Sequence, residues 1–523
     1  MSRTAADIGA GLSPTRPARP IRQGERIHVI GAGGAGASAA ALLGLWAGAA
    51  VDGCDPGGPS PYTAALEAAG IGLAWEHDPA HVRAGGVAVD RVAVTKALTA
   101  ISPDHAELAA ARASDTPVEA WQQVVADAAV GRTLAAVAGT HGKSTSAGWL
   151  THVLADAGRD PAAFVGALLP GGLTGGPRAT ARRGRGAAFV VEADEYAGNF
   201  DPFLPDVAIV TSVDWDHPDV FPDLDAVVDV IAAWLRRAGD GRATPPVLVA
   251  NVADAGVERL VDALSDWPGH LIATALVDVA PQRVAGYGRG IAERFTTAGG
   301  PTRTVLGRPH RLDPGGSTIE LRGLGDAEEP REVRLATAGR HNAANSLGVA
   351  GAALALGLNA AEIVAGLTTF GGVGRRLELK GEAGRVVVYD DYGHHPTAIR
   401  ETIRALRQRE PERRLWAVLE PLTYHRTAAL RDELGAALAA ADAVVVADIW
   451  PGRDPDHTIA SPADVAGAAA AVAPQLPIAT PGSVEATAAW LAHEVRPGDA
   501  VLVMGGGRSY RIAELLLEAL DRA

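Results

Sequence analysis

Short apolar runs alternate with alanine-rich segments along most of this chain, and the alternation begins at residue 26. Residues 26–30 read Arg-Ile-His-Val-Ile, a strand-like run that leads into the glycine-rich segment 31–36. The alanine-rich segment that follows has the composition of a helix, and residues 50–55 form a second apolar run. A strand, a helix and a second strand in this order are typical of a βαβ unit. Further apolar runs, such as residues 87–94, extend the α/β pattern to about residue 130.

A second α/β unit begins with the apolar run at residues 133–137. The runs at 187–192 and 206–211 resemble buried parallel strands, and each carries polar residues at its C-terminal end. Open α/β sheets bind their ligands at this end of the strands. Between about 270 and 335 the sequence becomes rich in Gly, Pro, Arg and Thr, which predicts a peripheral β insertion or long loops.

A third unit starts near residue 370 and is predicted to be another doubly wound domain. Its apolar runs lie at 385–389, 415–419, 443–447 and 500–504, separated by helix-like segments. The whole pattern therefore predicts an α/β fold divided into a flexible tail and three domains, at residues 1–25, 26–130, 131–370 and 371–523.

Composition narrows the class of protein. A chain of 523 residues exceeds what one hydrophobic core supports. The net charge of −14 argues against a general nucleic-acid or anionic-membrane surface, although local basic clefts still suit phosphates. One cysteine, Cys54, excludes an intramolecular disulfide and fits a reducing compartment. Without a signal-peptide pattern or an apolar run of about 18 residues, we expect a cytoplasmic protein, either a monomer or a homodimer.

The most specific motif is the segment 138–145, Ala-Gly-Thr-His-Gly-Lys-Ser-Thr, which lies between a predicted strand and a predicted helix. Glycines allow a tight turn whose N–H groups face an anion, and the helix N-terminus adds partial positive charge. Lys143 is placed to reach terminal phosphates and Ser144 to bind Mg²⁺. The motif differs from the general P-loop pattern because Val137 stands where that pattern has glycine.

Four further constellations suggest chemistry. Gly31-x-Gly33-x-x-Gly36, with Asp55 after the next strand, suits a diphosphate and a ribose, and its spacing does not distinguish NAD from a UDP-sugar. The segments 192–195 (Glu-Ala-Asp-Glu) and 214–217 (Asp-Trp-Asp-His) follow two apolar strands and suit a divalent cation.

The remaining two constellations lie in the C-terminal half of the chain. Asn342 and Asn345 share one face of a predicted helix, where two amides suit a base edge. Arg375-Arg376 and the segment 389–396, Tyr-Asp-Asp-Tyr-Gly-His-His-Pro, bring cations, carboxylates and imidazoles to one region. Such a combination is typical of a functional loop.

Taken in order, these motifs resemble the Mur ligase family, the ATP-dependent three-domain amino-acid ligases of peptidoglycan synthesis. The resemblance covers about residues 26–520 and rests on seven segments: 30–36, 138–145, 192–195, 216–217, 339–342, 374–376 and 390–396. It implies a three-domain architecture, with a Rossmann-like N-terminal domain, a central P-loop ATPase-type α/β domain and a Rossmann-like C-terminal domain.

The implied reaction uses ATP and Mg²⁺ to join L-alanine to the lactyl carboxylate of UDP-N-acetylmuramate through an acyl phosphate. The family's roles carry over to residues of this chain. The implied UDP-sugar contacts are Gly31, Gly33, Gly34, Gly36, Asp55 and His77. The implied ATP contacts are Gly139, Thr140, His141, Gly142, Lys143, Ser144, Thr145, Asn342, Asn345, Arg376 and Asp390. The implied catalytic groups are Lys143, Glu192, His217 and Arg375, the metal ligands are Ser144, Glu192 and His217, and the amino-acid contacts are Tyr392, His394 and Arg426.

The acceptor loop departs from the family pattern. Where a Gln-Pro-His segment is common, residues 420–422 read Glu-Pro-Leu, while Arg426 keeps a cation suited to a carboxylate. The glycine turn at 505–507 also differs from the Gly-Ala-Gly-Asn-like turn that is usual in the family. The amino-acid acceptor is therefore open at this point.

Three other readings remain. A murein tripeptide ligase would attach a preformed tripeptide to the same sugar nucleotide. An NAD-dependent dehydrogenase would use Gly31 to Gly36 but leave the Lys143 loop without a role. A non-catalytic sensor of ATP and sugar nucleotide would be expected to lack a phosphate or metal group, and Lys143, Ser144, Glu192 and His217 are all present.

Overall fold

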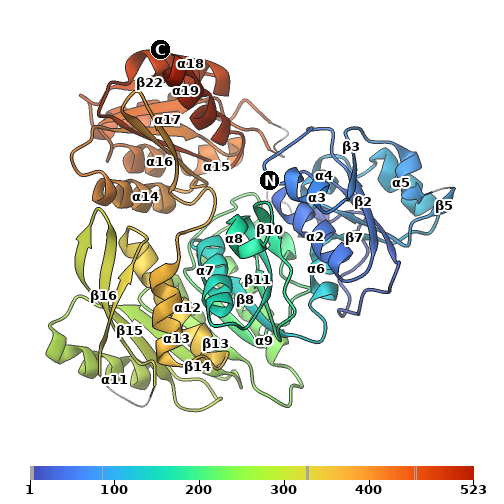
Figure 1. Cartoon of the computed structure of the whole chain (residues 1–523), viewed down its shortest axis with the longest axis horizontal. Coiled ribbons are helices and arrows are strands. Elements are labelled where there is room, and N and C mark those ends of the chain that lie inside the picture. The colour runs from blue at the N-terminus through green and yellow to red at the C-terminus, as the bar shows by residue number, and fades with distance from the viewer. Residues whose placement is uncertain (1–4, 85, 326–328, 453, 455, 523) are drawn as a thin grey trace.

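The computed structural model describes residues 5–84, 86–325, 329–452, 454 and 456–522. Their strands form three large sheets, one in each expected domain, and Figure 1 shows the central domain touching both others. The mixed α/β fold with mainly parallel sheets agrees with the sequence prediction. Within the described residues, every helix is too short or too polar to cross a bilayer.

The N-terminal domain contains a five-stranded sheet in the order β3-β2-β1-β6-β7, with every pair parallel. Apolar side chains of β1 and β6 are buried, because helices cover both faces. The strands are β1 (Arg26–Ile30), β2 (Ala50–Cys54), β3 (Gly72–Ala74), β6 (Arg91–Val94) and β7 (Val118–Ala120), with a hairpin of β4 (Arg83–Ala84) and β5 (Val87–Ala88). The helices are α2 (Ala35–Trp46), α3 (Thr63–Ala68), α4 (Lys96–Ile101), α5 (Ala106–Ala113), α6 (Trp121–Ala128) and the 3₁₀ turn η1 (Pro79–Val82).

The central domain has a ten-stranded sheet in the order β10-β9-β11-β8-β12-β13-β14-β15-β16-β17. The strands are β8 (Thr133–Ala138), β9 (Ala162–Leu169), β10 (Ala179–Arg182), β11 (Ala188–Glu192), β12 (Val207–Val210), β13 (Val247–Asn251), β14 (His270–Leu276), β15 (Arg303–Asp313), β16 (Gly316–Arg322) and β17 (Arg331–Leu335). The helices are α7 (Lys143–Asp156), α8 (Gly171–Thr174), α9 (Leu224–Gly239), α10 (Ala255–Ala263), α11 (Val284–Arg294), α12 (Arg340–Ala355), α13 (Ala360–Thr369), η2 (Tyr196–Gly198) and η3 (Pro281–Arg283).

The segment 270–335, expected to be a peripheral β insertion or long loops, forms in its described residues four strands that extend this sheet at one edge. β14 pairs in parallel with β13, and β15, β16 and β17 continue the same edge, the last two in antiparallel pairings. Figure 1 shows these strands beside α11, on the side of the central domain away from the N-terminal domain.

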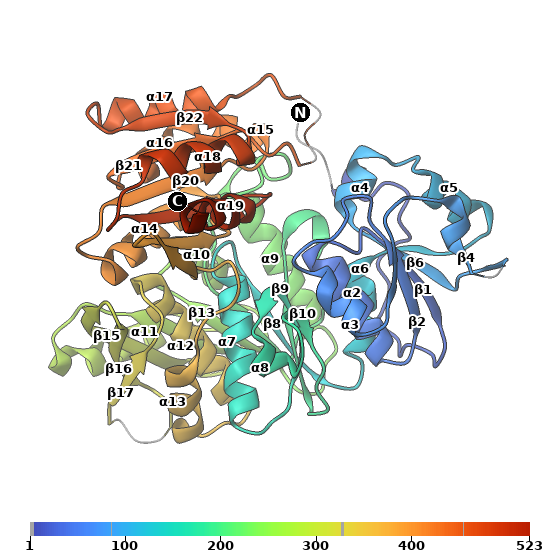
Figure 2. The same cartoon turned by 45° about the horizontal axis from the view of Figure 1, so that its top comes forward.

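The C-terminal domain contains a six-stranded sheet in the order β18-β19-β23-β20-β21-β22, parallel except for β18. Figure 2 shows this domain lying over the central one, with α14 and the loops at its base facing inward. The strands are β18 (Glu378–Ala383), β19 (Val386–Asp391), β20 (Leu415–Glu420), β21 (Ala443–Ala447), β22 (Ile478–Gly482) and β23 (Ala500–Gly505). The helices are α14 (Pro396–Arg409), α15 (Tyr424–Ala429), α16 (Arg431–Leu438), α17 (Pro462–Val472), α18 (Val484–Glu494) and α19 (Tyr510–Arg522).

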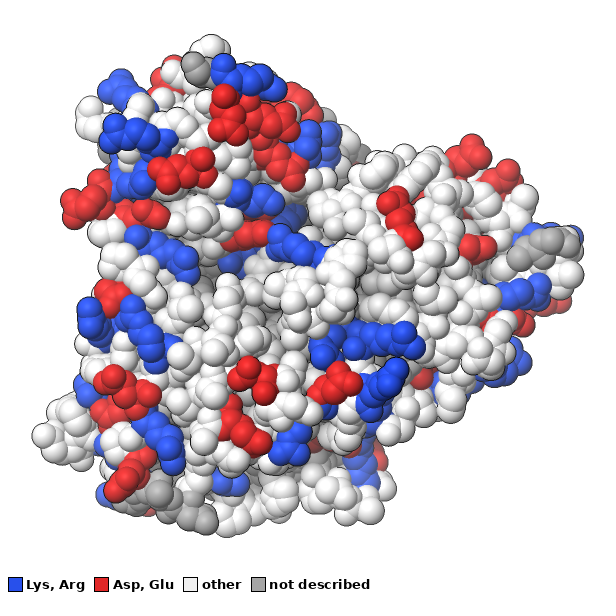
Figure 3. Space-filling model, viewed as in Figure 1, with Lys and Arg blue, Asp and Glu red and all other residues white. Residues whose placement is uncertain are grey.

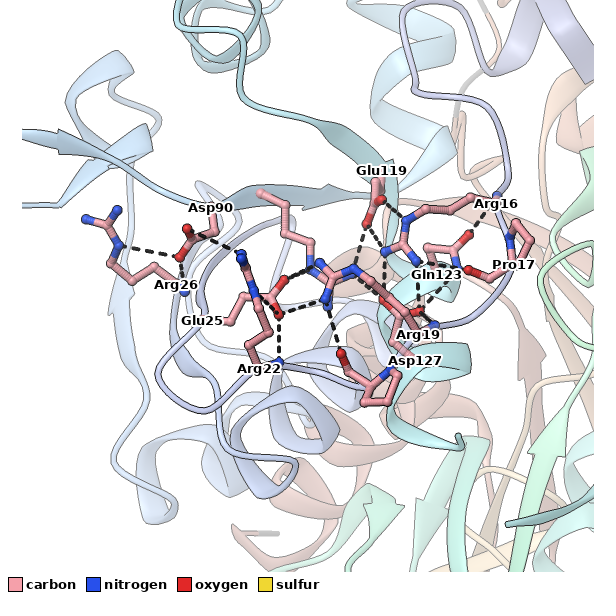
Figure 4. Close-up of polar contacts among 12 residues, drawn as sticks. Arg16, Pro17, Arg19, Arg22, Glu25, Arg26, Asp90, Glu119, Gln123 and Asp127 are labelled. Atoms are coloured by element: carbon pink, nitrogen blue, oxygen red, sulfur yellow. Dashed lines mark hydrogen bonds and ion pairs between the residues drawn. The ribbon is translucent and has the colours of Figure 1, made fainter. Parts of the chain in front are cut away.

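The described part of the expected flexible tail is packed against the N-terminal domain. Ile8, at the end of α1 (Ala5–Ile8), is completely buried. Arg16 forms ion pairs with Glu119 and Asp127, and Arg19 pairs with Glu25, as Figure 4 shows. The structure thus places these tail residues in ion pairs with buried carboxylates of the N-terminal domain, and their flexibility stays a prediction.

Charge alone does not mark a binding face. Figure 3 shows acidic and basic side chains interspersed over the surface seen in this view. The candidate site must therefore be identified from its cavities and side-chain geometry.

Candidate active site

The loop between β8 and α7 has the backbone geometry of a phosphate-binding turn. Gly139 has φ of 115°, and a Cβ there would lie 2.6 Å from the carbonyl oxygen of Ser212. Gly142, with φ of 80°, directly precedes the first residue of α7. Only glycine adopts both conformations without strain. The positive end of α7 thus faces the cavity that Gly142 and Lys143 line.

Lys143 is held at the mouth of this loop by carboxylates. Its Nζ donates to the Gly139 carbonyl at 2.7 Å and to Glu195 at 3.0 Å, and Asp194 lies 3.6 Å away. Burial alone would lower the pKa of Lys143, but the nearby carboxylates outweigh it and raise the pKa. The ammonium is therefore a permanent positive charge, as a phosphate ligand requires.

Ser144 and Glu192 form an oxygen pair beside the loop. The Ser144 hydroxyl donates to Glu192 Oε1 at 3.0 Å, and the Gly166 N–H donates to Oε2 at 2.6 Å. A Cβ on Gly166 would lie 2.8 Å from this carboxylate, so glycine is required there. Arg376, from the C-terminal domain, donates to the same Ser144 hydroxyl at 2.8 Å.

A second group suited to a cation lies next to this pair. The ligand atoms of Asp194, Glu195 and His217 lie within 4.8 Å of one another. The structure therefore places His217 with these two carboxylates, whereas the sequence reading grouped it with Ser144 and Glu192. Glu192, Asp194 and His217 line one cavity together with Lys143. Ser144 and Glu195 lie behind its lining.

Arg426 joins the C-terminal and central domains. Its Nε donates to Asp216 Oδ1 at 2.8 Å, and its Nη2 lies 3.1 Å from His217 Nδ1. Arg426 and Asp216 are 4% and 7% exposed. Burial would raise the pKa of Asp216, but the charges of Arg426 and His217 hold it well below its usual range. The pair is thus a buried ion pair across a domain boundary.

The expected amino-acid contacts lie around the same cavity. Tyr392, His394 and Arg426 line it together with Leu422. The guanidinium carbon of Arg376 lies 5.1 Å from the centre of the Tyr392 ring. Burial lowers the pKa of His394 well below its usual value, and the charge of Arg426 adds to this effect. His394 is therefore a neutral imidazole at neutral pH.

A second cavity lies on the other side of the phosphate loop. Asn342 and Asn345 line it, as expected, and Asn345 Nδ2 lies 3.4 Å from Asn342 Oδ1. The expected loop residues His141, Gly142 and Thr145 also line this cavity. Thr140, another expected loop residue, lines the first cavity instead, together with His141. The Thr140 N–H donates to the Ser212 carbonyl at 2.9 Å.

Arg375 and Asp390 do not lie on either of these two cavities. Arg375 Nε donates to Asp390 Oδ2 at 3.0 Å, and its Nη2 donates to the Gly505 carbonyl and to Ser509. Asp390 is completely buried. Arg375 also lines a small pocket with Tyr62 of the N-terminal domain and Gly166 of the central domain. Asp391, next to Asp390, lines the second cavity together with Arg376, and the nucleotide contact of Asp390 and the catalytic role of Arg375 stay predictions.

The glycine-rich loop after β1 is fastened by Asp55. The Gly33 N–H donates to Asp55 Oδ2 at 2.9 Å, and a Cβ on Gly33 would lie 2.7 Å from that oxygen. Gly31 has φ of 80°, and Gly34 directly precedes α2. Gly36 lines the first cavity, so this loop opens toward the Lys143 site.

His77 lies elsewhere. Its Nδ1 is 3.3 Å from Cys54 Sγ and 3.3 Å from Glu107 Oε2, and it lines neither cavity. The structure thus places His77 beside Cys54 and Glu107, and a UDP-sugar contact by His77 stays a prediction.

Several cavity residues have no sequence signal of their own. Trp121 and Gln122 reach the first cavity from the start of α6, and Phe164 reaches it from β9. Asp214 does stand in a recognised segment, but its partners were not predictable: it lies 3.3 Å from His141 and accepts a hydrogen bond from Thr397 at 2.8 Å. Thr397 belongs to another domain, and only the folded arrangement reveals this contact.

Two family models match the chain. Residues 26–133 match the catalytic domain of the Mur ligase family, and residues 375–507 match the glutamate ligase domain of Mur ligases.

Relatives similar to the whole chain share one description. A UDP-N-acetylmuramate–L-alanine ligase of Kineococcus radiotolerans is 38% identical over 489 residues, covering 92% of this chain and 93% of the relative. Another, from Frankia casuarinae, is 35% identical and covers 95% and 98% of the two chains.

Solved structures share the fold. A UDP-N-acetylmuramate–alanine ligase of Thermotoga maritima has a TM-score of 0.71 at 21% identity, covering 94% of this chain and 98% of that one. A murein peptide ligase of Psychrobacter arcticus has a TM-score of 0.70 at 23% identity, covering 96% and 99%. The two acceptor types therefore share one architecture, and the fold alone does not separate them.

Proposed function

This chain belongs to the Mur ligase family, and from this premise we propose that it is an ATP-dependent ligase joining L-alanine to the lactyl carboxylate of UDP-N-acetylmuramate. The reaction forms an amide in peptidoglycan synthesis. One observation carries the proposal. Groups from all three domains converge on one cavity: Gly36 from the first, Lys143 and Glu192 from the second, and Arg376 and Arg426 from the third.

Transfer of the γ-phosphoryl group needs neutralised charge and alignment. Lys143 and Arg376 supply two cations beside the phosphate loop, and the N-terminus of α7 adds partial positive charge. The lactyl carboxylate attacks the γ-phosphorus, the bond to the β-γ bridging oxygen breaks, and ADP leaves. This gives an acyl phosphate, with no covalent bond to the protein.

The donor set fits Mg²⁺. The Ser144 hydroxyl and the Glu192 carboxylate, 3.0 Å apart, are hard oxygen donors next to the phosphate loop. Asp194, Glu195 and His217 form a neighbouring set, of which Asp194 and His217 line the same cavity. When bound, Mg²⁺ would neutralise phosphate charge and orient the γ-phosphoryl group.

Amide formation needs a neutral amine. The His394 Nδ1 lies 2.9 Å from the Tyr392 carbonyl, which only accepts, so Nδ1 carries the proton and Nε2 has a free lone pair. The lowered pKa keeps this ring neutral. We assign His394 Nε2 as the acceptor of the proton that the alanine amine loses when it attacks the acyl carbon and phosphate leaves. Arg426 suits the alanine carboxylate.

The two ends of the site bind the nucleotides. The glycine-rich loop 31–36 at the N-terminus of α2 suits the UDP diphosphate. The second cavity, with Asn342, Asn345 and Asp391, suits the adenosine of ATP.

Phosphate release from ATP and Mg²⁺ with UDP-N-acetylmuramate tests the proposal. L-alanine, glycine, L-serine and the tripeptide L-alanyl-γ-D-glutamyl-meso-diaminopimelate are compared as acceptors. We expect release that depends on L-alanine and an amide product of matching mass. Lys143→Ala removes the phosphate cation, and Lys380→Ala on β18 serves as a matched lysine control.

The other outcomes separate the alternatives. Release with the tripeptide alone would assign the chain to murein recycling. ATP and sugar-nucleotide binding without turnover for any acceptor would indicate a sensor. Equal release by Lys143→Ala and the wild type would contradict the catalytic site itself.

A further inference from the structure

A second cluster of reactive side chains lies in the N-terminal domain, outside both cavities of the active site. We call it the histidine–cysteine cluster. It brings together residues from β1, the end of β2, the segment after β3, η1 and the start of α5. Its members are His28, Cys54, His77, His81, His105 and Glu107.

The spacing of its atoms resembles that of a tetrahedral metal site. Cys54 Sγ lies 3.4 Å from His28 Nε2 and 3.3 Å from Glu107 Oε2. Four ligands around Zn²⁺, with Zn–N bonds of about 2.0 Å and Zn–S bonds of about 2.3 Å, are separated from one another by roughly 3.3–3.6 Å. The ligand atoms of His28, Cys54, His81 and Glu107 all lie within 4.8 Å of one another.

One pair is closer than a bound ion would allow. His81 Nδ1 and Glu107 Oε1 are 2.7 Å apart, which is a hydrogen-bond distance. Metal binding would open this contact by about 0.6 Å, to the ligand separation of a tetrahedral site. Such a shift is within reach of His81, because its side chain is 22% exposed.

The orientation of His28 fits a ligand. Its Nδ1 lies 2.7 Å from Asp52 Oδ1, so Nδ1–H donates to this carboxylate and Nε2 is left with a lone pair toward Cys54. Histidines that bind metals are commonly oriented by a carboxylate in this way. Asp52 is half exposed and can bear its charge, so it would act as the orienting group rather than as a ligand.

The burial of Glu107 among histidines also fits a metal ligand. Its side chain is completely buried, and each ion pair recorded for it among the described residues is with a histidine. The Asp78 N–H and the Cys54 thiol also donate to this carboxylate, at 3.0 and 3.3 Å, so the polar groups of the cluster converge on Glu107. Among the described residues, the buried Nδ1 of His105 has no hydrogen-bond partner, so the cluster also holds an unsatisfied polar atom.

We propose that the histidine–cysteine cluster binds a divalent transition metal of the zinc class, with His28 Nε2, Cys54 Sγ, His81 Nδ1 and Glu107 as ligands. A thiolate and two imidazoles favour such an ion over Mg²⁺ or Ca²⁺, which prefer oxygen. Cys54 binds as the thiolate, so metal uptake transfers its proton to solvent.

The site would fasten the loop that faces the sugar nucleotide. The Cys54 carbonyl accepts hydrogen bonds from the N–H groups of Gly31 and Ala32, at 2.8 and 3.1 Å. Asp55, the next residue, holds Gly33. A metal on Cys54 would therefore fix the end of β2 directly behind the glycine-rich loop.

Metal content tests the proposal without reference to catalysis. The full-length protein is loaded with Zn²⁺ without Mg²⁺ or nucleotide, passed through metal-free buffer, and analysed by inductively coupled plasma mass spectrometry. We expect about one zinc ion per chain for the wild type and less than about a tenth of that for Cys54→Ser. His81→Ala, at a less buried position, is a second variant with the same expectation. His217→Ala and His493→Ala should keep their zinc.

Cobalt substitution identifies the ligands. Co²⁺ in a thiolate site gives a near-ultraviolet charge-transfer band, and we expect this band in the wild type and its loss in Cys54→Ser. Zinc content near zero in the wild type would overturn the proposal. Zinc that persists in both Cys54→Ser and His81→Ala, or that is lost in His217→Ala, would also overturn it, because the ion would then lie elsewhere.

Discussion

Replacing Arg426 by alanine is expected to weaken domain closure and catalysis together. Its guanidinium bonds the buried Asp216 carboxylate at 2.8 Å and lies 3.1 Å from His217, so the substitution leaves a buried charge on the central domain without its cation. Truncating one partner of a buried, hydrogen-bonded charge pair costs about 2–5 kcal/mol. Because a tenfold change corresponds to about 1.4 kcal/mol, we expect kcat/KM for L-alanine to fall by about 30- to 4,000-fold.

The assay is phosphate release at saturating ATP and UDP-N-acetylmuramate, with L-alanine varied. Arg431→Ala is the matched control, because Arg431 lies five residues further on and pairs with Asp432 at the surface, where both side chains are at least half exposed. Exposed ion pairs contribute about 0–1 kcal/mol, so this variant should keep most of its activity. A rate for Arg426→Ala within about threefold of the wild type, or an equal loss in Arg431→Ala, would refute the reasoning.

Three other substitutions have defined outcomes. Gly36→Ala places a Cβ 2.2 Å from the Trp121 ring, so the ring or the start of α2 must shift. This shift should raise the KM for the UDP-sugar with less effect on kcat, and unchanged steady-state constants would contradict the expectation. Arg91→Met leaves three carboxylates without a buried cation, and we expect a loss of about 3 kcal/mol, seen as a lower temperature of thermal unfolding. Burial raises the pKa of Glu420 to about 7, so the folded state keeps a proton that the unfolded state loses, and the contribution of this group to the free energy of unfolding declines from about pH 4.5 to pH 7. Glu420→Gln should therefore flatten the decline of the unfolding free energy with pH, as measured by chemical denaturation. An unchanged slope would argue against this role of Glu420.

The sequence predicted elements of the sheets well, because apolar runs of parallel strands are local signals. The run at 133–137 became β8 and the run at 443–447 became β21. Phosphate-loop chemistry was also predictable, since Gly139 and Gly142 need conformations that other residues resist. Both features depend on residues close together in the chain.

Side-chain contacts that depend on distant parts of the chain could not be predicted from the sequence. Neighbouring positions on a strand face opposite sides, so Asp390 points into the domain and pairs with Arg375, while Asp391 reaches the cavity. His77 joins Glu107 on a helix thirty residues away, and no spacing rule brings them together. Motif order was sufficient for the family but not for the direction of each side chain.

The hydrogen bonds around Ser144 suggest an order of events. Its hydroxyl bonds both Glu192 and Arg376, so the closed arrangement already joins the phosphate loop to the C-terminal domain. In the function proposed above, Ser144 binds the cation of ATP, and its hydroxyl would then lose the hydrogen bond from Arg376 when the nucleotide binds. The freed guanidinium is then beside the phosphates, where it gains stronger charge-assisted hydrogen bonds than a neutral hydroxyl provides. Loss of this one hydrogen bond would thus leave the Arg376 cation next to the proposed site of phosphoryl transfer.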